Sequence, residues 1–238
     1  MPLTRKVVFL IAALASLCSV TSHAAETDEA LISIRFSCYA LGTIDARGLY
    51  YLDEGEPRAF RISSAFRRGP YDYTGPNPLV FYRDGRSPDG STIRIPVASA
   101  RIDPALKELL LFFVNNDAHQ PGEATPEMKV IVMNDDLRAF PAGAYRVFNL
   151  SEHEIGCLFG EEKFIVPGKD YKTVNLDEGD QVNVRIHFSS NIDGEWVPQI
   201  NTRWLYSSNE RNIVFVADDY STRHPRLKIN TITQYLEQ

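Results

Sequence analysis

Hydrophobic and polar residues alternate with a period of two along several stretches of the chain. The segments TIRIPVAS (92–99) and QVNVRIHFS (181–189) each place apolar side chains at every second position. This alternation is typical of a β-strand with one buried and one solvated face, because successive side chains of a strand point to opposite sides. In the first segment the predicted buried face carries Ile93, Ile95 and Val97.

Three other runs are apolar at consecutive positions: 109–114, 130–133 and 213–216. Runs of this kind are typical of central strands that are covered on both faces. Pro96 has no N–H group to donate to a neighbouring strand, so we expect its strand at the edge of a sheet.

Turn-forming sequences rich in Gly, Asn and Asp separate these runs at intervals of roughly ten residues. Short strands separated in this way predict an all-β protein. The candidate strands outnumber the seven of a simple sandwich. We therefore expect two tandem immunoglobulin-like antiparallel β-sandwich units, with one large β-sandwich as the alternative.

The segment NNDAHQPGEATPE (115–127) is polar, contains two prolines and has no apolar pattern. A composition of this kind indicates a boundary or a long loop. We place the first sandwich unit at 25–115, a linker or long loop at 116–127, and the second unit at 128–238.

A short motif occurs twice, as LDEGE at 52–56 and as LDEGD at 176–180. Aligning the two copies also brings similar residues together in the segments that follow. We expect each copy to form a tight turn leading into a strand, with Gly55 and Gly179 at positive φ. The match favours a tandem repeat of two related β units, although a chance match of common turn residues is the alternative.

The first residues have the order of a secretory signal peptide. Arg5 and Lys6 precede the uncharged stretch 7–20, and small residues follow up to Ala24. A basic start, a short apolar run and a small-residue cleavage site predict a signal peptide at 1–24. We expect an exported protein, periplasmic or extracellular, with no transmembrane segment in the mature chain, because no later run is long enough to span a bilayer.

Two cysteines remain after the predicted cleavage, Cys38 and Cys157. Each shares a face with neighbouring apolar residues, so both side chains are expected to point inward. Export permits a disulfide between them. Two separately buried free thiols are the alternative, because sequence does not determine connectivity.

The charge and motif content exclude several classes of function. The formal net charge is -6, and removal of Arg5 and Lys6 would make the mature chain more acidic, which disfavours nucleic-acid binding. The histidines and cysteines have no metal-ligand spacing, and no nucleophile or phosphate-loop motif is present, so we predict no metal and no cofactor. A pair of carboxylates that hydrolyses a glycoside requires no motif and stays open.

The segment 64–83 combines arginines and tyrosines with three prolines. We select Arg67, Arg68, Tyr71 and Tyr73 as a candidate partner-binding loop, because arginine and tyrosine dominate binding hot spots. The alternative is that Tyr71 and Tyr73 fold back over the end of the sandwich.

Four segments, GPNPLVFYR, LLLFFVNN, FPAGAYRVFNLS and RNIVFV, resemble a group of secreted bacterial tandem-sandwich proteins with no assigned activity. The resemblance implies an exported all-β protein and implies no catalytic residue. We therefore expect an exported non-catalytic envelope protein that binds a protein or a glycan. The alternatives are a secreted carboxylate-dependent glycoside hydrolase and a purely structural spacer or assembly component.

Overall fold

A computed structural model describes residues 31–120, 125–176, 179, 182–219 and 226–236. Within these ranges the chain forms sixteen β-strands and no helix. The strands make four sheets of four strands each. The all-β prediction is therefore confirmed.

The first eight strands form two sheets with the strand orders β4-β1-β7-β8 and β3-β2-β5-β6. Their bounds are β1 (Ile32–Leu41), β2 (Tyr50–Asp53), β3 (Glu56–Ala59), β4 (Arg68–Gly75), β5 (Leu79–Arg86), β6 (Thr92–Ala100), β7 (Glu108–Asn115) and β8 (Met128–Asn134).

The last eight strands form two sheets with the orders β12-β9-β15-β16 and β11-β10-β13-β14. Their bounds are β9 (Ala144–Asn149), β10 (Ile155–Phe159), β11 (Glu162–Val166), β12 (Tyr171–Asn175), β13 (Asn183–Ile192), β14 (Glu195–Leu205), β15 (Glu210–Asp219) and β16 (Arg226–Tyr235).

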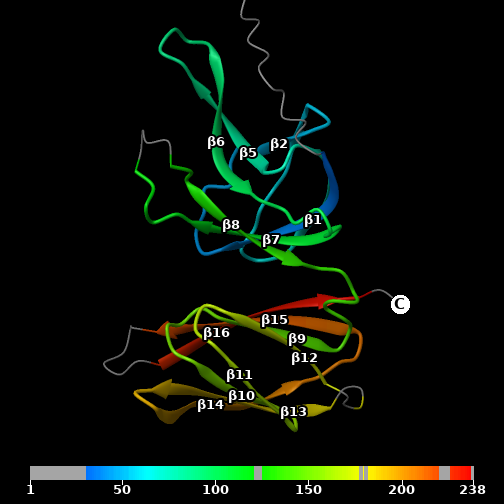
Figure 1. Cartoon of the computed structure of the whole chain (residues 1–238), viewed down its shortest axis with the longest axis vertical. Helices are drawn as coiled ribbons and strands as arrows, with labels where there is room; N and C mark the ends of the chain where they lie inside the picture. The colour runs from blue at the N-terminus through cyan, green and yellow to red at the C-terminus, as the bar shows by residue number, and fades with distance from the viewer. Residues whose placement is uncertain (1–30, 121–124, 177–178, 180–181, 220–225, 237–238) are drawn as a thin grey trace, which may run out of the picture.

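The four sheets stack as layers along the long axis of the molecule (Figure 1). The sheets β4-β1-β7-β8 and β12-β9-β15-β16 lie in the middle, and we call them the inner sheets. The sheets β3-β2-β5-β6 and β11-β10-β13-β14 lie at the two ends, and we call them the outer sheets. Each outer sheet packs on its own inner sheet over a hydrophobic core, so the predicted tandem β-sandwich is confirmed.

The two units are topological repeats of each other. Adding eight to each strand number of the first unit reproduces the strand orders of the second. Each unit also contains one parallel pair within otherwise antiparallel sheets, β1 with β7 and β9 with β15. The shared order supports a duplicated fold independently of any sequence motif.

The motif LDEG does not mark equivalent places in the two units. The copy at 52–56 spans the turn between β2 and β3, where Gly55 has φ +86°. The copy at 176–180 follows β12, outside any hairpin that corresponds to β2–β3. Its residues 177, 178 and 180 lie outside the described residues, so the positive φ expected at Gly179 stays a prediction. The counterpart of the β2–β3 hairpin in the second unit is β10–β11, so the predicted alignment of the repeat was wrong.

A β-bulge next to a proline occurs in both edge strands β6 and β14. In β6 the pairing with β5 jumps from Ala98 to Pro96, and in β14 the pairing with β13 jumps from Ile200 to Pro198. Each strand thus carries a proline followed by one extra residue, a β-bulge that limits further pairing at a sheet edge. The predicted edge position of the Pro96 strand is confirmed.

The inner sheets pack against each other through an apolar cluster between the units. The strand registers show that its residues occupy equivalent positions: Tyr39 and Phe148, Leu41 and Leu150, Leu110 and Ile213, Phe112 and Phe215, and Met133 and Ile232. The rings of Phe112 and Phe215 meet edge to face, with 5.2 Å between centroids. Both faces of β7 and β15 are therefore covered, as the consecutive apolar runs predicted.

A buried ionic cluster joins the units beside this apolar interface. The carboxylate of Asp135 accepts a hydrogen bond from Arg67 of the first unit and lies 2.9 Å from Nη2 of Arg211 in the second. The second contact is an ion pair without hydrogen-bond geometry. Gln234 accepts hydrogen bonds from both arginines, at 2.6 Å from Arg67 and 2.8 Å from Arg211.

Two buried arginines of the second unit also hold the connection between the units. Arg211 donates to the carbonyl oxygens of Asp135 and Phe140, both at 2.9 Å. Arg146 donates to the carbonyl oxygens of Asn134 and Ala139 at 2.7 and 2.8 Å. Burial lowers the pKa of both guanidinium groups, and these acceptors replace the water that each charge loses.

Three sequence predictions need correction. Strand β8 pairs with β7, and Arg83 of β5 binds the carboxylate of Glu127, so the second unit does not begin at 128 and the segment 116–127 connects two strands of the first unit, as the long-loop alternative predicted. The units are joined at 135–143 instead. β8 is an edge strand rather than a central one. Ile93 and Ile95 are 42% and 41% exposed because the β5–β6 hairpin extends beyond the core (Figure 1).

The predicted signal peptide at 1–24 lies outside the described residues. Within the described ranges, no helix has the length and apolar character needed to cross a membrane.

Candidate functional site

The predicted partner loop divides between the core and the surface. Tyr73 is buried, and its hydroxyl donates to the carbonyl of Pro76 at 2.5 Å. Tyr71 is half-buried against the first core, and its hydroxyl bonds the backbone N and O of Arg61. Both tyrosines lie on β4, where they cover the core as the alternative predicted, so they do not form an exposed hot spot.

The two arginines of the predicted loop have separate surroundings. Arg67 takes part in the ionic cluster between the units, so it is structural. Arg68 stacks its guanidinium over the ring of Phe66, with 4.5 Å from Cζ to the centroid. Of the four predicted residues, only Arg68 and Tyr71 line a cavity in the first unit away from the interface.

Cys38 and Cys157 are free thiols in different cores. A disulfide requires Cα atoms within roughly 7 Å, and here the interface between the inner sheets lies between the two side chains. The candidate disulfide is therefore not formed. Burial raises the pKa of each thiol to about 12, although Arg67 and Arg68 act in the opposite direction on Cys38.

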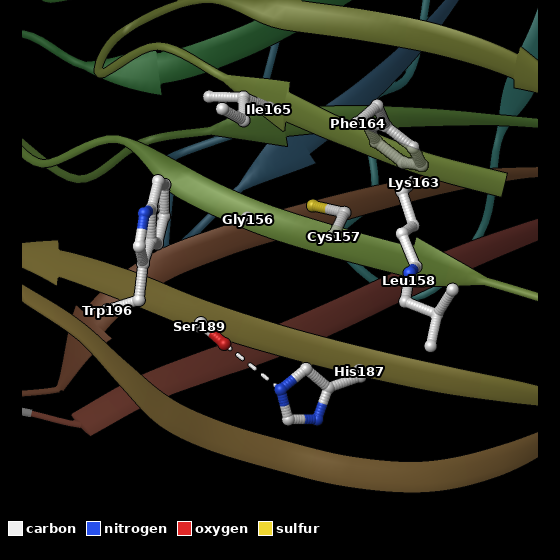
Figure 2. Close-up of a pocket in the computed structure, with 9 residues that line it drawn as sticks. All are labelled: Gly156, Cys157, Leu158, Lys163, Phe164, Ile165, His187, Ser189 and Trp196. Atoms are coloured by element: carbon white, nitrogen blue, oxygen red, sulfur yellow. Dashed lines mark hydrogen bonds between the residues drawn. The ribbon is translucent and has the colours of Figure 1, made fainter.

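The outer sheet of the second unit carries a shallow pocket with a volume of about 470 Å³ (Figure 2). It extends from Trp196 and Ile165 on the left of the view to Lys163 and Leu158 on the right. Trp196 is 44% exposed, and Ile165 is 50% exposed. Large apolar side chains from both edge strands of the sheet, β11 and β14, thus face solvent at one pocket.

The indole of Trp196 lies directly over Gly156. A Cβ at position 156 would lie only 3.1 Å from Cζ3 and 3.4 Å from Cε3 of Trp196. Strand pairing places Gly156 on β10 opposite Ser189 of β13, and Trp196 comes from the next strand, β14. The absent side chain therefore makes room for the ring to lie over the backbone.

Polar groups surround this apolar surface. Nε2 of His187 lies 3.0 Å from Oγ of Ser189, and Lys163 lines the same pocket. Nδ1 of His187 is buried without a hydrogen-bond partner in the described part of the chain. The hydroxyl, the imidazole and the ammonium give the pocket both donors and acceptors for a ligand that has many hydroxyl groups.

The equivalent face of the first unit is built differently. Tyr50 and Tyr82 occupy the positions that correspond to Gly156 and Ser189. Their rings stack with 5.8 Å between centroids, and the Tyr50 hydroxyl bonds Asp84 at 2.8 Å. The second unit thus has small residues where the first has two tyrosines, and the two faces carry different pockets: that of the first unit, about 530 Å³, lies beside Tyr50 and Asp84.

A cleft with a volume of about 720 Å³ lies between the units, and three acids line it. Asp135 is held by Arg67 and Arg211, and Asp136 accepts a hydrogen bond from the backbone N–H of Arg138. The third acid, Glu108, pairs with Arg35 across β1 and β7, and the pKa of Arg35 is raised mainly by its hydrogen bond to Asp72 and further by Glu108. The described residues contain no group of three or more His, Cys, Asp or Glu side chains that could hold a metal ion.

Comparison of the chain with protein-family models finds no match, and comparison with curated proteins finds none.

Proposed function

We propose that this chain is an exported, non-catalytic envelope protein that binds a glycan over Trp196 on the outer sheet of the second unit. Export rests on the order of basic, apolar and small residues in the first 24 positions. The glycan proposal rests on one observation, the partly exposed indole of Trp196 that lies over Gly156 within a pocket.

A pyranose ring matches this surface chemically. One face of the sugar presents C–H groups, which pack on the apolar face of an aromatic ring, while its hydroxyls need hydrogen-bond partners. Ser189, His187 and Lys163 supply these partners at the rim. The pocket volume of about 470 Å³ lies within the ~300–1,000 Å³ usual for small-ligand sites.

The test is binding of the purified protein to insoluble polysaccharides and to peptidoglycan sacculi, measured by co-sedimentation. Trp196→Ala should remove sedimentation with the glycan that the wild type binds. Tyr235→Ala is the matched control, because it removes a more exposed aromatic side chain, 72% exposed, from a different sheet. Equal sedimentation of Trp196→Ala and wild type would exclude the proposal.

A second candidate function is protein binding at the free edge of β14. This strand has eleven residues, pairs with β13, and exposes Trp196, Val197 and Leu205. An extended segment of a partner could add to such an edge as a further strand. Pro198 restricts this addition to the residues that follow the bulge.

The two candidates respond differently to a charge at Leu205. Leu205→Lys places a cation on the free edge but leaves the pocket of Trp196 intact, so it should weaken strand addition and spare glycan binding. Light scattering of the wild type across a concentration series measures self-association through the same edge.

A further inference from the structure

A cavity in the first unit is lined by arginines and by no carboxylate. Its volume is about 620 Å³, and Arg47, Arg61, Arg68 and Tyr71 contribute to its wall. The whole chain has a formal net charge of -6. A cavity with this lining is therefore a local concentration of positive charge on an acidic protein.

One of the three arginines is already neutralised. Nε and Nη2 of Arg47 each lie 2.8 Å from a carboxylate oxygen of Asp45. Arg61 and Arg68 form no ion pair with any residue in the described ranges. Two positive charges at this cavity thus lack a counter-charge within the described chain.

The guanidinium of Arg68 is positioned by an aromatic ring and not by a carboxylate. Its guanidinium packs over Phe66, and its Nε is buried with no hydrogen-bond partner in the part of the chain that the structure describes. A partly desolvated cation interacts more strongly with an anion than a cation in bulk water does. An anion bound here would also offset the cost of burying the guanidinium.

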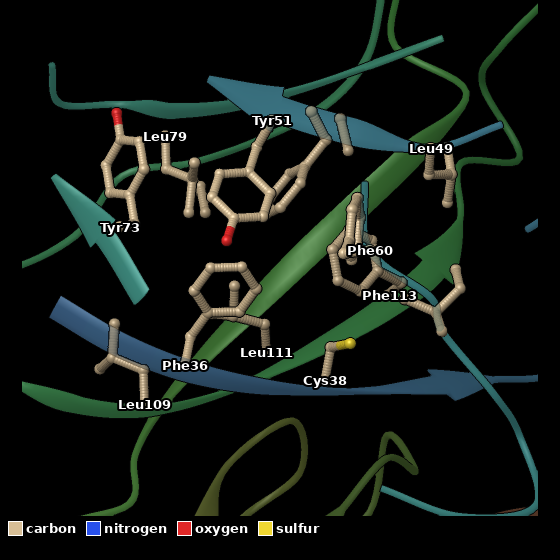
Figure 3. Close-up of a cluster of buried hydrophobic side chains, with 14 of the residues drawn as sticks. Phe36, Cys38, Leu49, Tyr51, Phe60, Tyr73, Leu79, Leu109, Leu111 and Phe113 are labelled. Atoms are coloured by element: carbon tan, nitrogen blue, oxygen red, sulfur yellow. The ribbon is translucent and has the colours of Figure 1, made fainter. Parts of the chain in front are cut away.

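Residues around these arginines are tied to the backbone of the unit and to its buried core. Tyr71 bonds the backbone N and O of Arg61 at 3.1 and 3.3 Å, which fixes Arg61 beside β4. Leu49 and Phe60 line the cavity and also belong to the buried core around Phe36 (Figure 3). A ligand would therefore meet a cavity whose walls are anchored to the core, with the exposed Arg61 side chain at its edge.

We propose that this cavity is an oxyanion-binding site in which Arg68 and Arg61 bind a carboxylate or a phosphate group. The guanidinium group is planar and presents paired N–H donors, which match two oxygens of a carboxylate or phosphate. The two arginines come from different segments, so one anion bridges the start of β4 and the β3–β4 connection. The site is independent of the Trp196 pocket, which lies on the other unit.

The experiment titrates inorganic phosphate and glucuronate separately into the full chain at low ionic strength, with calorimetry as the readout. The wild type should bind at least one of them more tightly than it binds chloride at matched ionic strength. Binding of phosphate alone identifies a phosphate site, and binding of glucuronate alone identifies a site for sugar acids. Arg68→Gln and Arg61→Gln should each weaken binding about tenfold or more, because each removes a charge-assisted hydrogen bond.

Matched variants separate a specific site from a general charge effect. Arg101→Gln removes the same charge from an exposed position in the β6–β7 connection and should leave the affinity nearly unchanged. Arg68→Lys keeps the charge but loses the planar fork, so it should bind with intermediate affinity.

Two results would overturn the proposal: no binding of either anion beyond chloride, or equal weakening by Arg101→Gln and Arg68→Gln. Trp196→Ala should leave anion binding intact, so failure of this proposal and failure of the glycan proposal are distinguishable.

Discussion

Removal of the Asp135 carboxylate tests the ionic cluster between the two units. The Asp135 side chain is 4% exposed, as is that of Arg211, while Arg67 is 25% exposed. Asp135→Ala leaves two guanidinium groups close together, with Gln234 as their shared acceptor. Truncating one partner of a buried ion pair costs ~3–5 kcal/mol.

The loss of stability caused by Asp135→Ala should fall at the lower end of this range of ~3–5 kcal/mol. Arg211 keeps its hydrogen bonds to two carbonyl oxygens, and Arg67 is exposed enough to gain water. We expect a loss of about 3 kcal/mol in the free energy of unfolding. For a chain of this size such a loss lowers the melting temperature by roughly 6–12 °C.

Urea unfolding followed by two probes gives the measurement. Both tryptophans, Trp196 and Trp204, lie on β14, so fluorescence reports the second unit while circular dichroism reports both. The wild-type transitions should coincide, and those of Asp135→Ala should separate as the units uncouple. Asp136→Ala is the control, because that side chain is 41% exposed and its ion pair with Arg138 is long, at 3.8 Å. A loss below about 1 kcal/mol for Asp135→Ala, typical of a surface ion pair, would refute the reasoning.

Three further outcomes are expected. Gly156→Val should displace the indole of Trp196, shifting its fluorescence and abolishing glycan binding, because the new side chain starts 3.1 Å from the ring. Gly55→Val should reduce the free energy of unfolding by about 1–2 kcal/mol, since φ +86° is unfavourable for a residue with a branched side chain. The free energy of unfolding of the wild type should also decrease as the pH rises from about 9 towards 12. Burial raises the pKa of Cys38 and Cys157, so the folded state keeps protons that the unfolded chain releases, and a double Cys→Ala variant should lose less stability over that range.

The sequence predicted the fold class because strand periodicity is a local property. The alternation in 181–189 matches the burial of Val184, Ile186 and Phe188, and the run 109–114 is a covered central strand. The same reasoning failed for Ile93 and Ile95, because alternation does not reveal that a hairpin extends past the core that would cover it. It also failed for β8, since an apolar run does not distinguish an edge from a centre.

The repeat was predicted from a motif that proved irrelevant to it. Turn residues recur for local steric reasons, so LDEG marks two different connections. The equivalent positions, such as Phe112 and Phe215, differ in their flanking residues and become visible only through strand register. Register depends on pairing between distant segments, which the sequence pattern alone did not provide.

The candidate sites depend on the same long-range information. Trp196 follows an ordinary Asp-Gly turn, and its role depends on Gly156, forty residues earlier, across two strands. Arg68 was selected because arginine is common in binding hot spots. Its position in a cavity without carboxylates depends on how β1 and β4, and β2 and β3, are arranged in the fold. Tyr73 was selected by the same rule and is buried, because residue type does not determine which face of a strand a side chain occupies.

The apolar interface between the inner sheets has the composition of a self-complementary contact. Each half contributes the same five positions, and Phe112 touches its own counterpart, Phe215. Symmetric dimers use one patch on both partners in this way. A contact of this kind uses only the inner sheets, so it leaves both end faces of the molecule free. These two faces differ, one carrying the stacked pair Tyr50 and Tyr82 and the other Trp196 beside Gly156.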